Sequence, residues 1–281
     1  MEKKLNSFIV SVFAIIFLFF MLFPLLLCLG NLKKPRTLER TSESQSFLPE
    51  IQVDALREEC VLPQSEDQGA KYLDKIIFLG ESTTYGLWRY GILSDGKNTN
   101  QVWTGATYSN GKSQCTGTLS LSPSIDQTMI YYPQDGRPMT VAQAVRKSTP
   151  EYLVITLGLN NGASYYTEEQ FKQCYRILLN SIIDASDQVE IILQSIFPVS
   201  KACKISAYTP DRIALCNSWI HDLAFEYDIK YLDTASALSD AEGYLDPEYD
   251  NGGDGIHMNE KGLTAVIKYI RTHAHPKEIQ P

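Results

Sequence analysis

The sequence lacks an excess of basic residues. Its 281 residues include 25 Lys and Arg against 33 Asp and Glu, so the formal net charge is −8 and the pI is near 5.1. Domains that hold nucleic acid usually carry a basic patch on one face. The charge balance removes that electrostatic basis, and we expect no nucleic-acid partner.

Metal-binding motifs and internal repeats are also missing. The chain has six cysteines and four histidines, with no Cys-x-x-Cys pair and no cluster of histidines. Structural zinc sites need four such ligands at short, regular spacings. We therefore expect no metal, and the chemistry predicted below needs no organic cofactor.

The pairing of the cysteines is left open. Five follow the N-terminal apolar run, an odd number, so at least one is unpaired unless it bridges to another chain. They are Cys60, Cys115, Cys174, Cys203 and Cys216. Cys203 and Cys216 flank a predicted loop and helix start, and we expect a local disulfide there if the domain is exported. The alternative is that they are buried free thiols, which act as small apolar residues.

An almost wholly apolar run extends from Phe8 to Leu29, interrupted by Ser11 and Pro24. About 20 such residues cross a bilayer as a helix. Two lysines precede the run, as in a signal sequence, but it exceeds the roughly 7–15 apolar residues of a cleavable signal peptide. The sequence therefore predicts an uncleaved signal-anchor over residues 1–30, with cleavage near Gly30 and secretion as the alternative.

Two opposing signals bear on the orientation of this segment. The basic residues after the span outnumber the two before it, which favours a cytoplasmic C-terminal side. They are Lys33, Lys34, Arg36 and Arg40. The very short tail before a signal-like run is instead typical of proteins whose following domain is exported. We expect a membrane-anchored protein with its domain outside the cytoplasm.

A polar spacer is predicted between the membrane segment and the domain. Residues 31–70 are mixed in charge, contain Pro35, Pro49 and Pro63, and show little periodicity. Such composition is typical of a linker. The remaining residues, 71–281, suit a single α/β domain of about 200 residues.

Short apolar runs alternate with longer amphipathic segments in this domain. The apolar runs predict buried parallel strands: Lys75–Leu79, Tyr152–Leu157, Val189–Ser195 and Ile229–Leu232. The amphipathic segments predict helices: Glu168–Ala185, Asp211–Tyr227 and Lys261–His273. This alternation predicts a doubly wound α/β fold, a flavodoxin-like three-layer α/β/α sandwich with a mostly parallel sheet.

One stretch, Gly91–Arg137, breaks the alternation. It is rich in Ser, Thr, Gly and Asn and contains three short β-like pieces: Gln101–Thr104, Thr118–Leu121 and Met129–Tyr132. We interpret it as one sheet strand followed by a loop or small hairpin over the active-site face.

Residues with catalytic potential lie where predicted strands end. Ser82 follows the first strand, Asn160 follows the second, and Asp254 and His257 precede the last helix. The ligand crevice of an open parallel sheet forms at the carboxyl ends of its strands. Serine becomes a nucleophile when an imidazole accepts its proton and a carboxylate fixes the imidazole. Ser82, His257 and Asp254 are therefore a candidate triad, with the Ser82 N–H and the Asn160 amide as oxyanion donors.

The motifs around these residues resemble those of the SGNH (GDSL-type) hydrolase family. They are, in the family's order, Gly80-Glu81-Ser82 with Gly86, Gly158-Leu159-Asn160 and Asp254-Gly255-Ile256-His257. The resemblance covers about Tyr72 to His275. It implies a further oxyanion glycine, with Gly105 favoured over Gly117, and a serine esterase that works through an acyl-enzyme.

Two positions depart from the family pattern. The usual aspartate before the serine is Glu81 here, and the aspartate that commonly follows the asparagine is Asn161. Neither residue belongs to the triad. Because Glu81 is a longer carboxylate, we expect its supporting contacts to differ.

Each motif also has a non-catalytic interpretation. Ser82 could cap the helix after the strand, Asp254 and Asn160 could form turns, and His257 could be a structural histidine. Since all four stand at strand ends in one known order, the set favours catalysis over these separate explanations.

The sequence therefore predicts a serine ester hydrolase that removes small acyl groups. The expected location suggests acetyl on a cell-surface glycan as the substrate. An O-acyltransferase, a lipase or a thioesterase would use the same triad. A glycan-binding module without turnover is the non-enzymatic alternative, with Glu81 and Asn161 as the first signs of drift.

Overall fold

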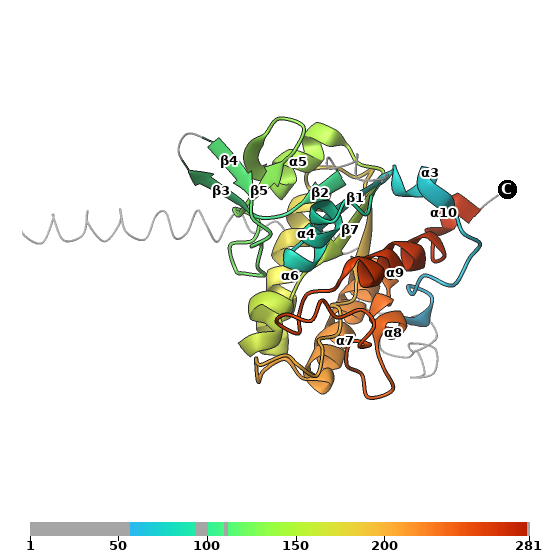
Figure 1. Cartoon of the computed structure of the whole chain (residues 1–281). Helices are drawn as coiled ribbons and strands as arrows, with labels where there is room; N and C mark the ends of the chain where they lie inside the picture. Colours follow the sequence, from blue (N-terminus) through green and yellow to red (C-terminus); the bar gives the residue numbers. More distant parts are fainter. Residues whose placement is uncertain (1–56, 94–100, 110–111, 280–281) are drawn as a thin grey trace, which may run out of the picture. The chain divides into compact units, whose positions relative to one another are not determined.

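The computed structural model of the chain describes residues 57–93, 101–109 and 112–279 (Figure 1). The predicted signal-anchor and most of the predicted spacer lie outside these residues. In the described part of the chain, no helix is both long and apolar enough to cross a membrane.

A five-stranded sheet forms the centre of the domain (Figure 1). Its spatial order is β2-β1-β7-β8-β9, and every neighbouring pair is parallel. The strands are β1 Ile76–Gly80, β2 Val102–Trp103, β7 Tyr152–Thr156, β8 Glu190–Gln194 and β9 Lys230–Leu232. This 2-1-3-4-5 order is that of flavodoxin-like sheets. The predicted α/β fold with a mostly parallel sheet is confirmed.

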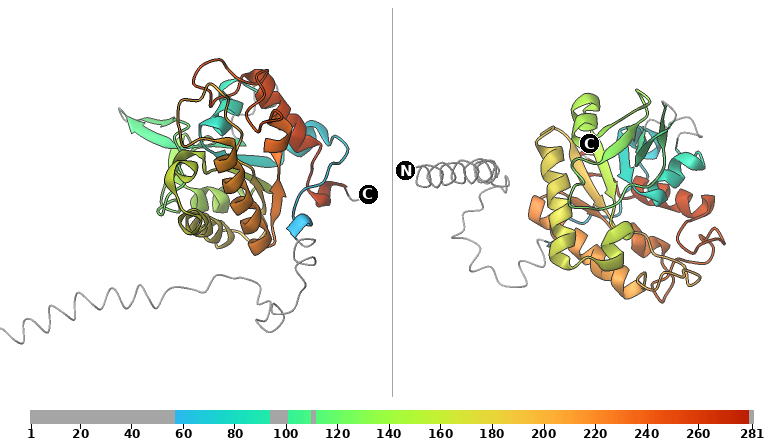
Figure 2. Two further views of the ribbon diagram at one scale, coloured as in Figure 1. Left: turned by 90° about the horizontal axis from the view of Figure 1, so that it is seen from below. Right: turned by 90° about the vertical axis from the view of Figure 1, so that its left-hand side faces the viewer.

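Helices pack on both faces of the sheet (Figure 2). They are α3 Gly69–Leu73, α4 Ser82–Arg89, α5 Val141–Ser148, α6 Glu168–Ile183, α7 Pro210–Tyr227, α8 Thr234–Leu238, α9 Glu260–Arg271 and α10 Pro276–Ile279. The buried side chains of α5, α6 and α7 belong to one core. The buried side chains of α3, α4, α8 and α9 belong to the other. Since successive strand residues point to opposite faces, Phe78 belongs to the second core and Leu79 to the first.

The three predicted long helices, now α6, α7 and α9, are confirmed with small differences at their ends. Each begins at a side chain that accepts a backbone N–H of the first turn: Thr167, Thr209 and Asn259. Such caps satisfy donors that have no partner within the helix. Polar caps before amphipathic stretches therefore determine where these helices start.

The irregular stretch contains more structure than we predicted. Its first piece is the edge strand β2, but two hairpins follow in place of one: β3 Ala106–Ser109 with β4 Lys112–Cys115, and β5 Met129–Tyr132 with β6 Arg137–Thr140. The β-like piece Thr118–Leu121 forms no strand. Leu119 and Leu121 are buried in the core from an irregular segment, so their apolar alternation reflects burial without strand pairing.

Of the two interpretations of Cys203 and Cys216, a disulfide in an exported domain or free thiols, the structure has the free thiols. All five cysteines of the described residues have free thiols. Cys216 is fully buried on α7, and this burial raises the pKa of its thiol to about 11. Cys203 is half-buried in a turn and packs against the core. The two cysteines therefore act as small apolar residues.

Candidate active site

Ser82 lies at the start of α4, directly after β1. The turn depends on Gly80, because a Cβ there would lie 2.1 Å from the Thr84 hydroxyl oxygen and 2.6 Å from the Thr156 carbonyl oxygen. Only glycine permits so close an approach. The N-cap position belongs to Glu81, and the Ser82 hydroxyl makes no hydrogen bond within the described residues. The structure thus gives no support to a capping role for Ser82.

Neighbouring strands bring the predicted oxyanion residues to the same edge of the sheet. The parallel register pairs Gly80 with Thr156 of β7, and Leu79 with Trp103 of β2. Ser82 lies two residues after the last paired residue of β1. Gly158 and Gly105 have the same position after β7 and β2. The carboxyl ends of three adjacent strands therefore supply this edge, as expected for an open parallel sheet.

Asn160 lies in an irregular turn, Leu159–Ala163, after β7. Its ψ of 125° and the φ of 66° at Asn161 are not helical. The side-chain amide of Asn160 donates to the Leu119 carbonyl at 3.2 Å. Since an amide NH₂ has two donors, a second N–H remains for an oxyanion.

The two candidate oxyanion glycines differ in their surroundings. Gly105 lies two residues after β2, the strand beside β1, and is buried. Gly117 packs against Tyr85 of α4, and its N–H is engaged with the Cys115 thiol. This geometry is in better accord with Gly105 as a donor.

His257 and Asp254 are in direct contact. The Nδ1 atom of His257 lies 2.6 Å from Oδ2 of Asp254, while Oδ1 accepts the backbone N–H groups of Ile256 at 2.8 Å and His257 at 3.0 Å. Partial burial tends to raise the pKa of Asp254, but these bonds outweigh it and lower that pKa to about 2. The carboxylate therefore stays ionised and leaves Nε2 as the ring nitrogen that can act on a substrate.

The loop that carries this pair rests on the turn after β8. The backbone N–H of Ser200 donates to the Gly255 carbonyl at 2.8 Å. Gly255 has a φ of +74°, and a Cβ there would lie 2.3 Å from the backbone nitrogen of Cys203. Both facts require glycine. The glycine between Asp254 and Ile256 therefore lets the loop settle against the turn.

The structure joins the predicted site residues in two groups. His257 bonds Asp254, and Asn160 is linked to the Ser82 turn through Glu81. No hydrogen bond between the Ser82 hydroxyl and His257 is found in the described part of the chain. Catalytic hydrogen bonds often close only when substrate is bound.

Comparison with known families decides the class of protein. Residues 78–265 match the GDSL-like lipase/acylhydrolase family. The chain belongs to this family. It is therefore a serine ester hydrolase, as its motifs predict. No curated protein sequence was found to match the chain.

Two solved structures share the fold of this GDSL-like hydrolase. One is a candidate platelet activating factor from Streptococcus pneumonia, with 16% identity, a TM-score of 0.51 and coverage of 80% of this chain and 98% of that chain. The other is a candidate acylhydrolase from Bacteroides fragilis, with 19% identity, a TM-score of 0.50 and coverage of 80% and 95%. At these identities the likeness concerns the fold alone.

Glu81 has a role in the GDSL-like site that the sequence did not predict. One carboxylate oxygen accepts the N–H of Leu159 and the other accepts the N–H of Asn160, both at 2.8 Å. Burial raises the pKa of Glu81 to about 7, although hydrogen bonds from Asn160, Leu159 and Gly158 oppose this rise. The only signal in the sequence was its position before Ser82.

Arg212 is the second residue that the sequence analysis missed. From the start of α7 its guanidinium donates to the carbonyls of Gly162 and Ala163, both at 3.0 Å, and of Tyr166. These carbonyls belong to the turn that follows Asn160 and to the residues after it. Because the contact joins residues about 50 positions apart, no local pattern could have predicted it.

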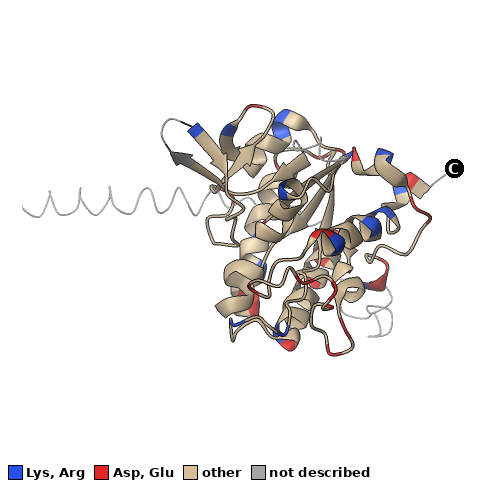
Figure 3. Ribbon diagram, viewed as in Figure 1, with Lys and Arg blue, Asp and Glu red and all other residues tan. Residues whose placement is uncertain are grey.

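Acidic residues gather on the loops between α8 and α9 (Figure 3). Residues 240–254, which end at Asp254, contain six Asp and Glu and no Lys or Arg. Within the described residues, no group of three or more His, Cys, Asp or Glu could hold a metal ion. Lys201 forms ion pairs with Asp240 and Glu242, and Lys261 pairs with Glu248, so Asp246, Asp250 and Asp254 are the carboxylates of this segment without a Lys or Arg partner among the described residues.

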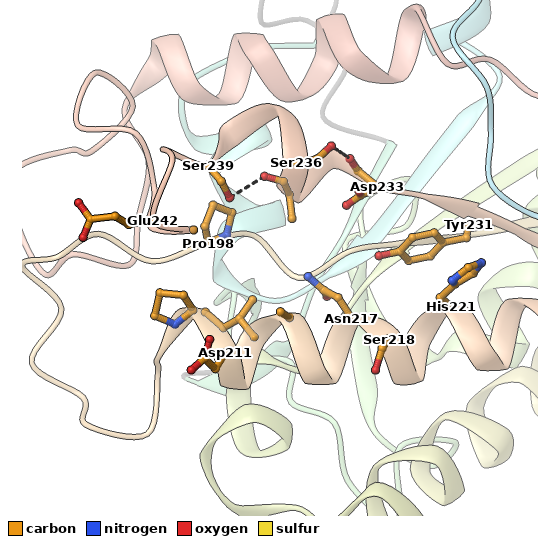
Figure 4. A pocket seen from close by; sticks show the side chains of 15 residues that line it. Pro198, Asp211, Asn217, Ser218, His221, Tyr231, Asp233, Ser236, Ser239 and Glu242 are labelled. Atoms are coloured by element: carbon orange, nitrogen blue, oxygen red, sulfur yellow. Dashed lines mark hydrogen bonds between the residues drawn. The ribbon is translucent and has the colours of Figure 1, made fainter. Parts of the chain in front are cut away.

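A separate cavity of about 470 Å³ lies between α7 and α8 (Figure 4). None of the predicted site residues lines it. Asn217 uses both atoms of its amide to bond the backbone of Ile196, and the Ser236 hydroxyl donates to the Asp233 carbonyl. These polar groups support the fold, and the cavity does not belong to the candidate active site.

Proposed function

We propose that this GDSL-like hydrolase removes small acyl groups, acetyl first among them, through an acyl-enzyme at Ser82. The observation that carries the proposal is the gathering of the Ser82 turn and the Asn160 turn at adjacent strand ends, together with a bonded His257–Asp254 pair. A partly exposed nucleophile, a neutral oxyanion donor and an oriented base are the parts that acyl transfer needs.

In the proposed reaction Ser82 attacks the ester carbonyl and His257 Nε2 takes the hydroxyl proton. The tetrahedral intermediate then expels the alcohol, which receives that proton from His257, and the acyl group stays on the serine oxygen. Water attacks this acyl-enzyme with His257 again as base, and the acid leaves as Ser82 regains its proton. Asp254 holds the imidazole in the required tautomer throughout.

The oxyanion of each tetrahedral intermediate would be held by three donors. These are the backbone N–H of Ser82, the backbone N–H of Gly105 and the free N–H of the Asn160 amide. All three are neutral, so they add no charge that must be desolvated when the site is empty. Donors of this kind contribute most when they are already in place before charge develops.

The proposed substrate is a neutral ester, an acetylated glycan outside the cytoplasm. Residues 1–30 would anchor the protein in the membrane, and the part of the predicted spacer before Arg57 would let the domain reach a surface polymer. The end of the predicted spacer packs on the domain, where Cys60 and Leu62 are buried and Val61 pairs with Tyr231 of β9. Asp250 and Asp254 lie beside His257 and form no ion pair with a described Lys or Arg. These two carboxylates favour a neutral ester over an anionic one, because like charges near His257 raise the energy of approach. Acetyl esters of neutral sugars meet this condition.

The first test is hydrolysis of p-nitrophenyl acetate by the full-length protein. We expect Ser82→Ala to lower kcat by a factor on the order of 10⁴ or more, because the nucleophile itself is removed. A matched control is Ser218→Ala, which removes an exposed hydroxyl that bonds the Leu215 carbonyl within α7. A fluorophosphonate probe should label the wild type and the control but not Ser82→Ala.

Each other outcome points to a different function. Equal rates in wild type and Ser82→Ala would exclude Ser82 as the nucleophile. A wild type that is labelled but moves acyl groups to added alcohols faster than to water would be an acyltransferase. A wild type that is neither labelled nor active, yet binds glycan unchanged by Ser82→Ala, would be a binding module.

A further inference from the structure

Glu81 is the single buried carboxylate of the described residues, with 2% of its surface exposed. Burying a carboxylate is costly unless it is paired or well hydrogen-bonded. No described Lys, Arg or His forms an ion pair with it; two backbone N–H groups of the turn after β7 bond it directly. The buried carboxylate of Glu81 therefore links the Ser82 turn to the Asn160 turn.

The two bonds to Glu81 fix the start of the turn after β7. Leu159 and Asn160 are its first residues, and the first backbone N–H groups of a helical segment have no partner within that segment. Each donates at 2.8 Å to a different oxygen of the same carboxylate. Because the next residue after Glu81 is Ser82, this carboxylate couples the nucleophile turn to the turn that carries Asn160.

We propose that the ionised carboxylate of Glu81 is a positioning residue that holds the Asn160 amide in place for the oxyanion, and that protonation of Glu81 releases this turn. The inference rests on the proposed function and extends it. A protonated carboxyl has one oxygen that carries a proton, and that oxygen would face a backbone N–H as donor against donor. One of the two bonds would then be lost.

The surroundings of Glu81 allow it to change state near neutral pH. Burial raises its pKa to about 7, against the effect of the backbone donors Asn160, Leu159 and Gly158. Two titratable groups interact with it, Tyr175 of α6 and Tyr208 before α7, and burial raises the pKa of both phenols, so both are neutral. No described cation opposes its protonation.

The kinetic test compares Glu81→Gln, Asn160→Ala and the double variant on p-nitrophenyl acetate. Glutamine keeps the shape of the side chain but offers only one acceptor oxygen. We expect Glu81→Gln to lower kcat about 10- to 100-fold with little change in KM, and Asn160→Ala to lower kcat about 10²- to 10³-fold. Because Glu81 acts through Asn160, the double variant should lose hardly more than Asn160→Ala alone. Losses that multiply would overturn the proposal.

The pH profile adds a readout that a merely structural role would not move. Protonation of Glu81 should add a fall of about 10- to 100-fold in kcat/KM as the pH drops through about 7. Glu81→Gln should lack this fall. An identical fall in both proteins would count against the role of Glu81.

Hydrogen exchange tests the positioning contact without activity. Amides 158–163 should exchange at least about tenfold faster in Glu81→Gln than in the wild type at pH 8, while amides of α9 stay unchanged. Unchanged exchange in residues 158–163 would overturn the inference. A wild type that hydrolyses no ester but shows the exchange difference would refute the proposed function alone, and the contact would stand.

Discussion

The imidazole of His257 and the carboxylate of Asp254 are joined by a hydrogen bond of 2.6 Å between Nδ1 and Oδ2. They are three positions apart in sequence, and Oδ1 of the same carboxylate accepts the backbone N–H of His257. The loop therefore orients the imidazole of His257, the base of the proposed reaction. Both side chains remain partly exposed, 38% for His257 and 48% for Asp254, so the pair contributes little to stability.

Asp254→Asn should lower kcat by about 10³- to 10⁴-fold, because an amide no longer selects the imidazole tautomer that accepts the serine proton. The free energy of unfolding should change by less than about 1 kcal/mol, since the pair is exposed. Ester hydrolysis and urea unfolding measure the two effects. Asp246→Asn removes the same charge from the same loop and should keep most activity; an equal loss in both variants would contradict this role for Asp254.

Gly255→Ala should destabilise the loop and abolish most activity. The new methyl group would meet the Cys203 backbone at 2.3 Å, and alanine resists the φ of +74°. Gly252→Ala is a matched control, because its φ is +76° but nothing lies within 4 Å of the added carbon. Thermal unfolding should show Gly255→Ala to be less stable than Gly252→Ala by about 2 kcal/mol or more. Hydrolysis should be slower in Gly255→Ala than in Gly252→Ala. Equal damage would mean that backbone strain alone matters.

Stability should depend on pH through Glu81. Its pKa rises from 4.5 in the unfolded chain to about 7 in the fold, so between these values the folded state holds the extra proton. The contribution of Glu81 to the unfolding free energy should therefore be complete below pH 4.5 and be lost as pH rises through 7, and it amounts to at most about 3 kcal/mol. Glu81→Gln should lack this component. Urea unfolding of both proteins at pH 5 and pH 8 checks it, and parallel pH dependences would refute it.

Arg212→Lys should loosen the turn after Asn160 although the charge is kept. Lysine cannot reproduce the planar fork that serves three carbonyls, nor the stacking of Arg212 over Trp219 at 5.0 Å. We expect a loss of about 1–3 kcal/mol in unfolding free energy together with a lower kcat. Arg146→Lys, at an exposed position of α5, should change neither quantity. A neutral Arg212→Lys would show that the contact does not hold the turn.

The sequence by itself determined the parallel strands, the long helices and the order of the motifs. These features are local: a buried strand needs a continuous apolar run, a helix needs an apolar stripe and a cap, and a motif needs only its neighbours. For this reason Ser82, Asn160, Asp254 and His257 could be named before their surroundings were known. The direct contact between Asp254 and His257 was also foreseeable from their spacing of three.

Only the tertiary structure decided how these parts are held. The bond from Asn160 to Glu81 joins residues 79 positions apart, and Arg212 reaches its carbonyls from another helix. The apolar residues Leu119 and Leu121 are buried without a strand, and Cys216 is buried without a disulfide. Such outcomes depend on which surfaces meet when the sheet is assembled, and a local pattern contains no information on partners so far away in the chain.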